Sequence, residues 1–290
     1  SIAATAANGG ILTPADEIAE EAGLTENVLP YHFDKTVYEN RLYFGYGKAQ
    51  EEAPLKYGPN IADWPKMQPL TENILLEAAC VIYDPVTTTD ELIPSGETSS
   101  YRSNPLRLAE FTLSRKDPEY VTRAKQIAAA EKARLDYIGG DLQAEEVFKE
   151  AYREIGDTVI LAHTTGIGSV VAAVKPGDGS AREQAASCQK VLGGWANIAS
   201  AYATKRYRSN LINWGMLPFT VDDFDGLALE NGDRIYIKGI RKAVENAETD
   251  IKAALYRKNG TKEDILLHLT DLSEDERKII LAGSLINFYN

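Results

Sequence analysis

A glycine-rich turn between an apolar run and a helical segment constrains the fold of this chain most strongly. The apolar run Ser169–Val174 predicts a buried strand, and Gln184–Val191 predicts a helix. Between them lie Pro176 and two glycines, Gly177 and Gly179. Glycine tolerates the positive φ that a tight turn needs. A strand must therefore end and a helix begin within a few residues.

The same turn predicts an anion site. We expect Ser180 at or near the helix N-cap and Arg182 in the first helical turn. The first N–H groups of a helix lack intrahelical partners and carry the positive end of its dipole, so they attract anions. An arginine beside them can hold a carboxylate through two parallel hydrogen bonds, and the alkoxide form of the serine would be stabilised there. The alternative is a structural turn with an N-cap serine.

Composition excludes several classes of function. The 290 residues carry a formal net charge of -12, which disfavours binding to nucleic acid or to an anionic membrane. Two cysteines, Cys80 and Cys188, fit a reduced, cytoplasmic setting and are too few to hold an iron–sulfur cluster. The three histidines have no metal-ligand spacing, so no metal site is expected in this chain.

Residues 1–70 and 71–290 differ in character. The first part predicts the end of a helix closed by Asn8-Gly9-Gly10 and a short helix, Ala15–Ala22. The rest of it is rich in Tyr, Gly and Pro, as in Leu29–Tyr31 and Tyr43–Gly47. We interpret residues 1–70 as the end of an upstream domain plus an extended linker, and expect the chain to be the C-terminal part of a longer protein.

Residues 71–290 predict an α/β domain with a mixed sheet flanked by helices. The predicted strands are Ile74–Tyr83, Thr158–Ala162, Ser169–Val174, Arg234–Lys238 and Ile251–Arg257. Gly166–Gly168 is expected to break the second strand, and Asn259-Gly260 predicts a hairpin that pairs Ala253–Arg257 with Asp264–His268. Trp195–Tyr202 fits a strand or a helix, with its alanines favouring a helix. The predicted helices are Leu106–Leu113, 117–139, Asp141–Ile155, Lys205–Asn213 and Asp275–Phe288.

Several motifs in order resemble the C-terminal swivelling domain of the aconitase superfamily. They are Gly177–Gln184, Leu192–Gly194, Asn210–Pro218, Ala282–Asn287, and Thr89–Ile93 with Arg102 twelve residues after Asp90. The resemblance covers about residues 70–290 and implies the family's swivelling β/β/α fold. The segment Pro94–Pro105 is most similar to uncharacterised aconitase-like hydratases, not to aconitase itself.

Carried onto this sequence, the resemblance implies roles for five residues. Ser180 would be the general base that moves a proton on a substrate carbon. Arg182 would bind a substrate carboxylate, and the Ala181 amide would help to hold negative charge on it. Arg102 would bind a second carboxylate or the substrate backbone. Asp90 would take part in the proton and hydrogen-bond network.

The sequence departs from the family pattern at three positions within these motifs. Ala181 replaces a second serine, and Gln184 and Glu91 stand where the family has histidines. A different hydrogen-bond network and a different substrate are expected to follow. Purely structural alternatives also remain: Asp90 could cap a turn, and Arg102 could lie over Tyr101.

The resemblance implies that the chain is the substrate-binding swivel domain of an iron–sulfur hydro-lyase. The substrate would be a hydroxy di- or tricarboxylic acid, and the chain would be inactive alone. The 4Fe-4S cluster would belong to upstream cluster-binding domains of the full-length protein. Three alternatives stay open: a small subunit of an isopropylmalate-isomerase-like heterodimer, a non-catalytic RNA-binding relative, and a degenerate relative kept for structure.

Overall fold

The computed structural model describes residues 1–23, 32–41, 45–54 and 56–290, which form two compact units, Ser1–Lys56 and Tyr57–Asn290. The first unit holds the helices α1 (Ile2–Ala7), α2 (Ala15–Glu21) and α3 (Thr36–Glu39). The two helices predicted in this part of the chain are thereby confirmed. The predicted loops at 29–31 and 43–44 lie outside the described residues.

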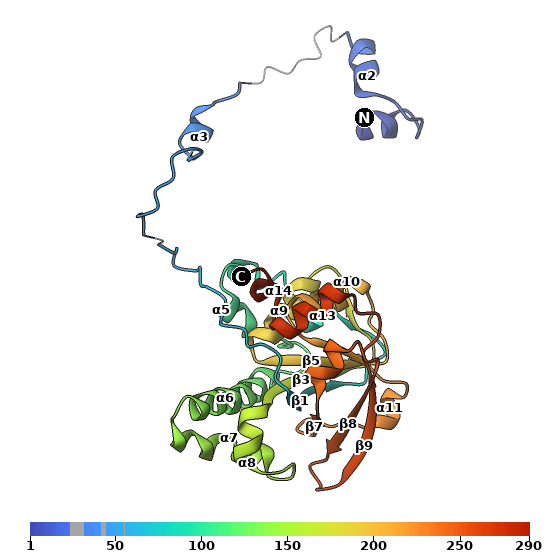
Figure 1. The fold of residues 1–290 in the computed structure, drawn as a ribbon. Helices are drawn as coiled ribbons and strands as arrows, with labels where there is room; N and C mark the ends of the chain where they lie inside the picture. Colours follow the sequence, from blue (N-terminus) through green and yellow to red (C-terminus); the bar gives the residue numbers. More distant parts are fainter. Residues whose placement is uncertain (24–31, 42–44, 55) are drawn as a thin grey trace. The chain divides into compact units, whose positions relative to one another are not determined.

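The second unit is built on a closed barrel of mixed direction (Figure 1). Its strands follow the order β1-β3-β5-β6-β9-β8-β7, and β7 pairs back to β1. The parallel part comprises β1 (Asn73–Ile82), β3 (Thr165–Ala173), β5 (Gly194–Ala199) and β6 (Leu217–Thr220). The antiparallel part comprises β7 (Arg234–Ile237), β8 (Asp250–Tyr256) and β9 (Lys262–His268). The predicted mixed sheet and the hairpin at Asn259-Gly260 are confirmed.

Alternation along the parallel strands divides the apolar side chains between two cores. Ile74 and Leu76 of β1 join one cluster with Val170 of β3, whereas Leu75 and Val171 point the other way and join the second. Successive side chains of a strand lie on opposite faces of the sheet. Every residue of β3 is buried, because this strand is covered on both faces.

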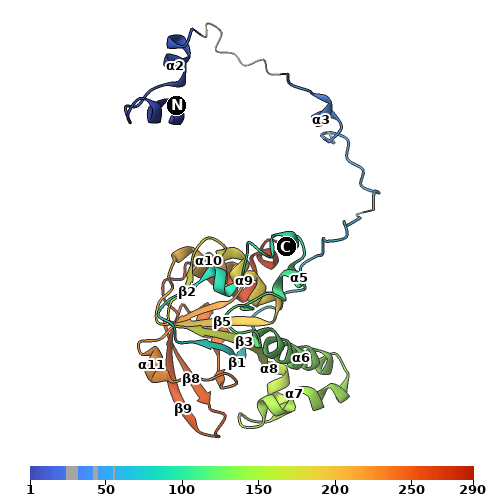
Figure 2. The same ribbon diagram turned by 180° about the vertical axis from the view of Figure 1, so that it is seen from behind.

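Helices cover the outer face of the parallel strands (Figure 2). α6 (Tyr120–Ile138), α7 (Glu145–Tyr152) and α8 (Thr158–Thr164) pack together beside β1 and β3, and α5 (Pro105–Ala109), α9 (Arg182–Val191) and α10 (Lys205–Asn213) form a second group. The remaining α-helices are α4 (Thr89–Leu92), α11 (Phe224–Leu227), α12 (Ile240–Glu245), α13 (Glu274–Ala282) and α14 (Leu285–Tyr289). Within the described residues, none of the helices combines the length and the apolar character needed to cross a bilayer.

Part of the predicted linker packs on the second unit. The ring of Trp64 lies 4.3 Å, centroid to centroid, from that of Trp214 at the end of α10. The amide of Ala62 donates a hydrogen bond of 3.0 Å to the carbonyl oxygen of Ser103. Residues 57–70 are therefore held by specific contacts, and the assignment of 71–290 to one family domain stays a prediction.

Three predictions about the strands differ from the structure. Thr158–Ala162 is part of α8, because Asp157 caps this helix by accepting a 3.0 Å hydrogen bond from the amide of Ile160. Local capping outweighs the β-branched composition here. The predicted break at Gly166–Gly168 lies inside β3, and the alanine-rich segment beginning at Trp195 is the buried strand β5. Parallel neighbours on both sides of β5 satisfy its backbone, which overrides the helical preference of alanine.

The predicted terminal helix is divided in two at Gly283. This residue ends α13 with a φ of 88°, and a Cβ placed on it would lie 2.0 Å from the carbonyl oxygen of Gln68. Ser284 then caps α14 by accepting a 3.1 Å hydrogen bond from the amide of Asn287. The glycine therefore allows both the left-handed turn and the close approach of residues 68–69.

A closed ring of buried hydrogen bonds joins α9, α10 and β5. The Tyr207 hydroxyl donates to Oδ1 of Asn197 at 2.7 Å, and Nδ2 of Asn197 donates to Oε1 of Gln189 at 2.7 Å. Nε2 of Gln189 completes the ring by donating to the Tyr207 hydroxyl oxygen at 2.9 Å. All three residues are fully buried, so their polar atoms need partners within the protein. The two amide nitrogens also donate to backbone carbonyl oxygens, whereas Oδ1 of Asn197 accepts only from Tyr207 among the described residues.

We expect Tyr207→Phe to lower the free energy of unfolding by about 1–3 kcal/mol, because it leaves the buried Oδ1 of Asn197 without a donor and removes one of the two acceptors of Nε2 of Gln189. Tyr289→Phe is the matched control, since Tyr289 is 79% exposed. Urea unfolding followed by circular dichroism measures both changes. Equal stability of the two variants would contradict a structural role for the ring.

Candidate active site

A short parallel ladder brings two distant loops together. β2 (Thr87–Thr88) follows β1 and pairs with β4 (Pro176–Asp178), which follows β3. The amide of Ala181 donates a hydrogen bond of 3.3 Å to Oγ1 of Thr89, the first residue of α4. The ladder therefore places the start of α4, which carries Asp90, beside the glycine-rich turn.

The two glycines of the turn allow close packing as well as tight turning. Gly177 has a φ of 95°, and a Cβ placed on it would lie 2.3 Å from the ring of Tyr207. Gly179 has a φ of 132°, and its Cβ would lie 2.3 Å from Oγ1 of Thr89. The turn is thus pressed between α10 and α4, which fixes the path of the chain into α9.

Ser180 lies exposed immediately before α9. The N-cap of this helix is Ala181, and no side chain caps it. The alternative that Ser180 acts only as a capping serine is therefore wrong. Its hydroxyl has no hydrogen-bond partner among the residues that the structure describes, so it is free to meet a ligand at the helix N-terminus.

The first turn of α9 is anchored at two points. Arg182 is its first residue, as expected, and Nη1 of Arg182 donates to the carbonyl oxygen of Gly179. Oε1 of Glu183 accepts a 3.1 Å hydrogen bond from Nε1 of Trp214. These contacts hold the start of the helix. The half-buried Arg182 side chain is held at Gly179, the residue next to Ser180.

Asp90 does not cap a turn, so that alternative is also wrong. Thr88 is the N-cap of α4, and its Oγ1 accepts a 3.2 Å hydrogen bond from the amide of Glu91. The Glu91 carboxylate closes the capping box by accepting from the Thr88 amide at 2.7 Å. Glu91, which replaces a histidine of the family pattern, therefore has a structural task here, and the exposed Asp90 carboxylate is left for other contacts.

Arg115 is a neighbour of Asp90 that the sequence did not reveal. Its guanidinium forms salt bridges with Asp90 and with Glu97, and the hydrogen bond to Glu97 is the main reason that the pKa of Arg115 is raised. Arg115 thus joins α4 to the loop that leads to Arg102. A single arginine in a polar segment has no periodicity or motif, so only the fold could show this contact.

Arg102 lies exposed at the end of a short 3-10 helix, Ser99–Tyr101. Its side chain has no ion pair or hydrogen bond within the described part of the chain. The cation over the Tyr101 ring is Arg107, whose Cζ lies 5.0 Å from the ring centroid, so the proposed stacking of Arg102 is wrong. The next helix, α5, packs against α9, which places the Arg102 loop on the same side of the barrel.

The residues of this chain do not fit an iron–sulfur cluster. Cys80 and Cys188 are both buried, and burial raises the pKa of each thiol well above its ordinary value, whereas metal binding needs the thiolate. Among the described residues, no three His, Cys, Asp or Glu side chains are grouped so that they could hold a metal. The site is therefore built of a serine, arginines, a carboxylate and a helix N-terminus.

Comparison with known proteins matches part of this unit to a known family. Residues 129–223, which include β3, the turn and α9, match the family model of the aconitase C-terminal domain. A mitochondrial aconitate hydratase from Gracilaria gracilis is 31% identical over 114 residues, which is 38% of this chain and 14% of that protein. A protein of Emericella nidulans, named provisionally as a mitochondrial aconitate hydratase, is 33% identical over 121 residues, which is 41% of this chain and 15% of that protein.

The matched region thus spans only about 15% of the length of the curated relatives. Among solved structures, a 3-isopropylmalate dehydratase from Methanocaldococcus jannaschii superposes with a TM-score of 0.42 at 18% identity, covering 75% of this chain and 93% of that chain. The family match includes the segment that carries the turn, Ser180 and α9. Residues 129–223 are therefore similar to the C-terminal, swivel-type domain of the aconitase superfamily.

Proposed function

We propose that this chain supplies the substrate-binding half of the active site of a hydro-lyase that acts on a hydroxy di- or tricarboxylic acid. One observation carries the proposal: Ser180 presents a free hydroxyl at the N-terminus of α9, beside Arg182, on a turn that the β2–β4 ladder joins to Asp90. The family match at residues 129–223 supports it.

The proposed chemistry follows from the charges at the turn. Ser180 takes a proton from the substrate carbon next to a carboxylate, which builds negative charge on that carboxylate. Arg182 and the N–H groups of the first turn of α9 stabilise this charge, and they also favour the alkoxide of Ser180. Arg102 binds a second carboxylate, which orients the substrate on the serine. Asp90, held by Arg115, completes the hydrogen-bond network.

We further propose that this chain works with cluster-binding domains, either on the same polypeptide or in a separate large subunit. A 4Fe-4S cluster there would supply the Lewis acid for the hydroxyl that leaves. The chain alone then binds substrate but does not turn it over. The changes at Ala181, Glu91 and Gln184 favour a substrate other than that of aconitase itself.

In the enzyme reconstituted with its cluster-binding domains, we expect Ser180→Ala to lower kcat by about 10²–10⁴-fold with little change in KM, because it removes the base and keeps the carboxylate contacts. Assays with citrate, methylcitrate and isopropylmalate identify the substrate and measure both constants. Ser200→Ala, at another exposed serine, serves as the control. Full turnover by the Ser180→Ala enzyme would show that Ser180 is not the general base.

Binding to the isolated chain tests the arginines without the cluster. We expect Arg102→Lys to weaken binding of the best of the three acids by about 1.5–3 kcal/mol, because lysine keeps the charge but loses the paired hydrogen bonds. Isothermal titration calorimetry measures this loss. The control is Arg107→Lys, since Arg107 lies over Tyr101 nearby. An equal loss in both variants would show that Arg102 makes no specific contact with the acid.

A further inference from the structure

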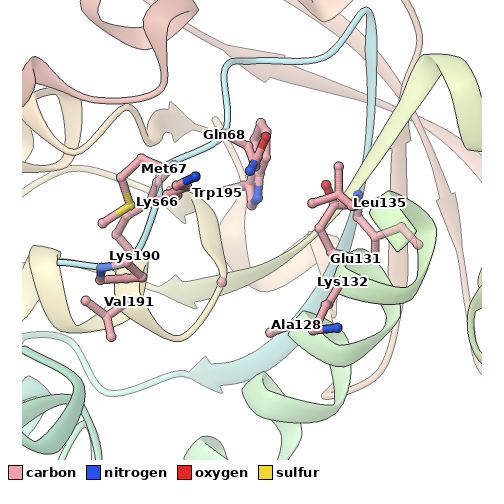
Figure 3. Close-up of a pocket in the computed structure, with 13 residues that line it drawn as sticks. Lys66, Met67, Gln68, Ala128, Glu131, Lys132, Leu135, Lys190, Val191 and Trp195 are labelled. Atoms are coloured by element: carbon pink, nitrogen blue, oxygen red, sulfur yellow. Dashed lines mark hydrogen bonds between the residues drawn. The ribbon is translucent and has the colours of Figure 1, made fainter. Parts of the chain in front are cut away.

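A cavity lies in this unit, apart from the residues of the proposed active site. It has a volume of about 550 Å³ and lies between the middle of α6, the last turn of α9 and the segment 65–68 (Figure 3). Neither Ser180 nor Arg182 is among the described residues that line it. Small-molecule sites in proteins have volumes of roughly 300–1,000 Å³, so the cavity is large enough for a metabolite.

The walls of this cavity combine apolar side chains with positive charge. Leu135 of α6 faces Met67, Val191 and Trp195 across it (Figure 3). Three lysines, Lys66, Lys132 and Lys190, also line it, together with one carboxylate, Glu131. In a chain with a net charge of -12, such a concentration of lysines around an apolar space is unexpected unless it binds an anion.

The single carboxylate does not neutralise these lysines, because it is already paired. Glu131 accepts hydrogen bonds from Arg134 at 2.6 and 2.7 Å and one of 2.8 Å from the amide of Ile167. Arg134 is itself buried and donates its remaining nitrogen to the carbonyl oxygen of Ala162 at 2.7 Å. This closed pair fixes α6 against β3. Lys132 has a counter-ion in Asp136 at 2.6 Å, whereas Lys66 and Lys190 form no salt bridge with any described residue.

Lys190 is the buried member of the three. Its side chain lies over the ring of Trp195, with Nζ 4.8 Å from the ring centroid, and only 6% of the residue is exposed. Nζ makes no hydrogen bond to any residue that the structure describes. Burial lowers the pKa of Lys190 to about 8, an effect that the charge of Glu131 opposes. A buried amine without a partner is costly, so its retention beside a cavity indicates a ligand that completes it.

We propose that this cavity binds a small carboxylic acid with an apolar body, its carboxylate paired with Lys190 and its body packed against Trp195, Met67 and Val191. A carboxylate fits because a single buried ammonium is present and the surrounding side chains are apolar. A phosphate would need more donors than this wall provides. This site is independent of the proposed hydro-lyase function, since it lies on another part of α9 from Ser180.

The 290-residue chain itself can be tested, with octanoate as the probe and 1-octanol as its uncharged counterpart. We expect calorimetry to show saturable binding of octanoate at one site and at least tenfold weaker binding of 1-octanol. Lys190→Met should weaken octanoate binding at least tenfold while leaving 1-octanol unchanged. Lys242→Met, at an exposed lysine of α12, should bind octanoate as the unmodified chain does.

The dependence on pH gives a second readout. With a pKa of about 8 in the free protein, Lys190 is charged at pH 7 and mostly neutral at pH 9, so octanoate affinity should fall by about tenfold between these values. The other charged groups that face the cavity are Lys66, Lys132 and the paired Glu131. If octanoate bound to a group with the ordinary pKa of a lysine, its affinity would not fall between pH 7 and pH 9.

Three outcomes would overturn the proposal: no saturable binding of octanoate, unchanged binding by Lys190→Met, or an equal loss in Lys242→Met. Lys190→Met should melt no lower than the unmodified chain, because it removes an unpaired buried charge. If the Lys190→Met variant does not fold, lysine acetylation of the unmodified chain, followed by mass spectrometry, tests the site instead. Octanoate should then slow the modification of Lys190 and not that of Lys242, and equal rates with and without octanoate would reject the site.

Discussion

The position of α9 depends on the packing of Gly177 against the ring of Tyr207. The absence of a side chain at Gly177 lets the turn lie directly on this ring, where a Cβ would approach to 2.3 Å. The hydroxyl of the same tyrosine closes the buried hydrogen-bond ring with Asn197 and Gln189. One residue therefore ties the turn, α9, α10 and the strand β5 to each other. This contact also positions Ser180 and Arg182, because both residues follow Gly177 at the start of α9.

The β2–β4 ladder fixes the loop that carries Asp90 beside the glycine-rich turn. It is short, yet it aligns the ends of β1 and β3, which are parallel neighbours in the barrel. The loops that leave the carboxyl ends of such strands meet at one edge of the sheet, where ligands of α/β proteins commonly bind. Salt bridges of Arg115 with Asp90 and Glu97 link α4 to the loop that contains Arg102. A binding surface is thus assembled from segments far apart in the sequence.

The same helix α9 serves both sites discussed above. Its first turn presents N–H groups and Arg182 to the proposed substrate, and its last turn places Lys190 beside the apolar cavity. The two ends of α9 differ in their exposure to solvent. Ser180 is exposed to solvent, whereas Lys190 is buried against Trp195. The helix is rigidly held between them by Gln189, which bonds to the carbonyl oxygen of Ala185 and to Tyr207.

The sequence by itself determined the features that rest on local chemistry and spacing. The turn at Gly177, the place of Arg182 in the first turn of α9 and the hairpin at Asn259-Gly260 follow from residue types next to one another, and all are present. The order of motifs also indicated the family. These features need few partners beyond their own segment, so the sequence carries them directly.

Only the tertiary structure decided the features that depend on distant partners. Barrel closure through β7 and β1, the strand β5 and the helix α8 are set by which segments lie alongside, and alanine or β-branched composition could not show this. Arg115 beside Asp90 and the Glu131–Arg134 pair beneath Lys190 are contacts between side chains that have no signature in the sequence. Burial of charge is a property of the packed fold, and a sequence shows charge but not its depth.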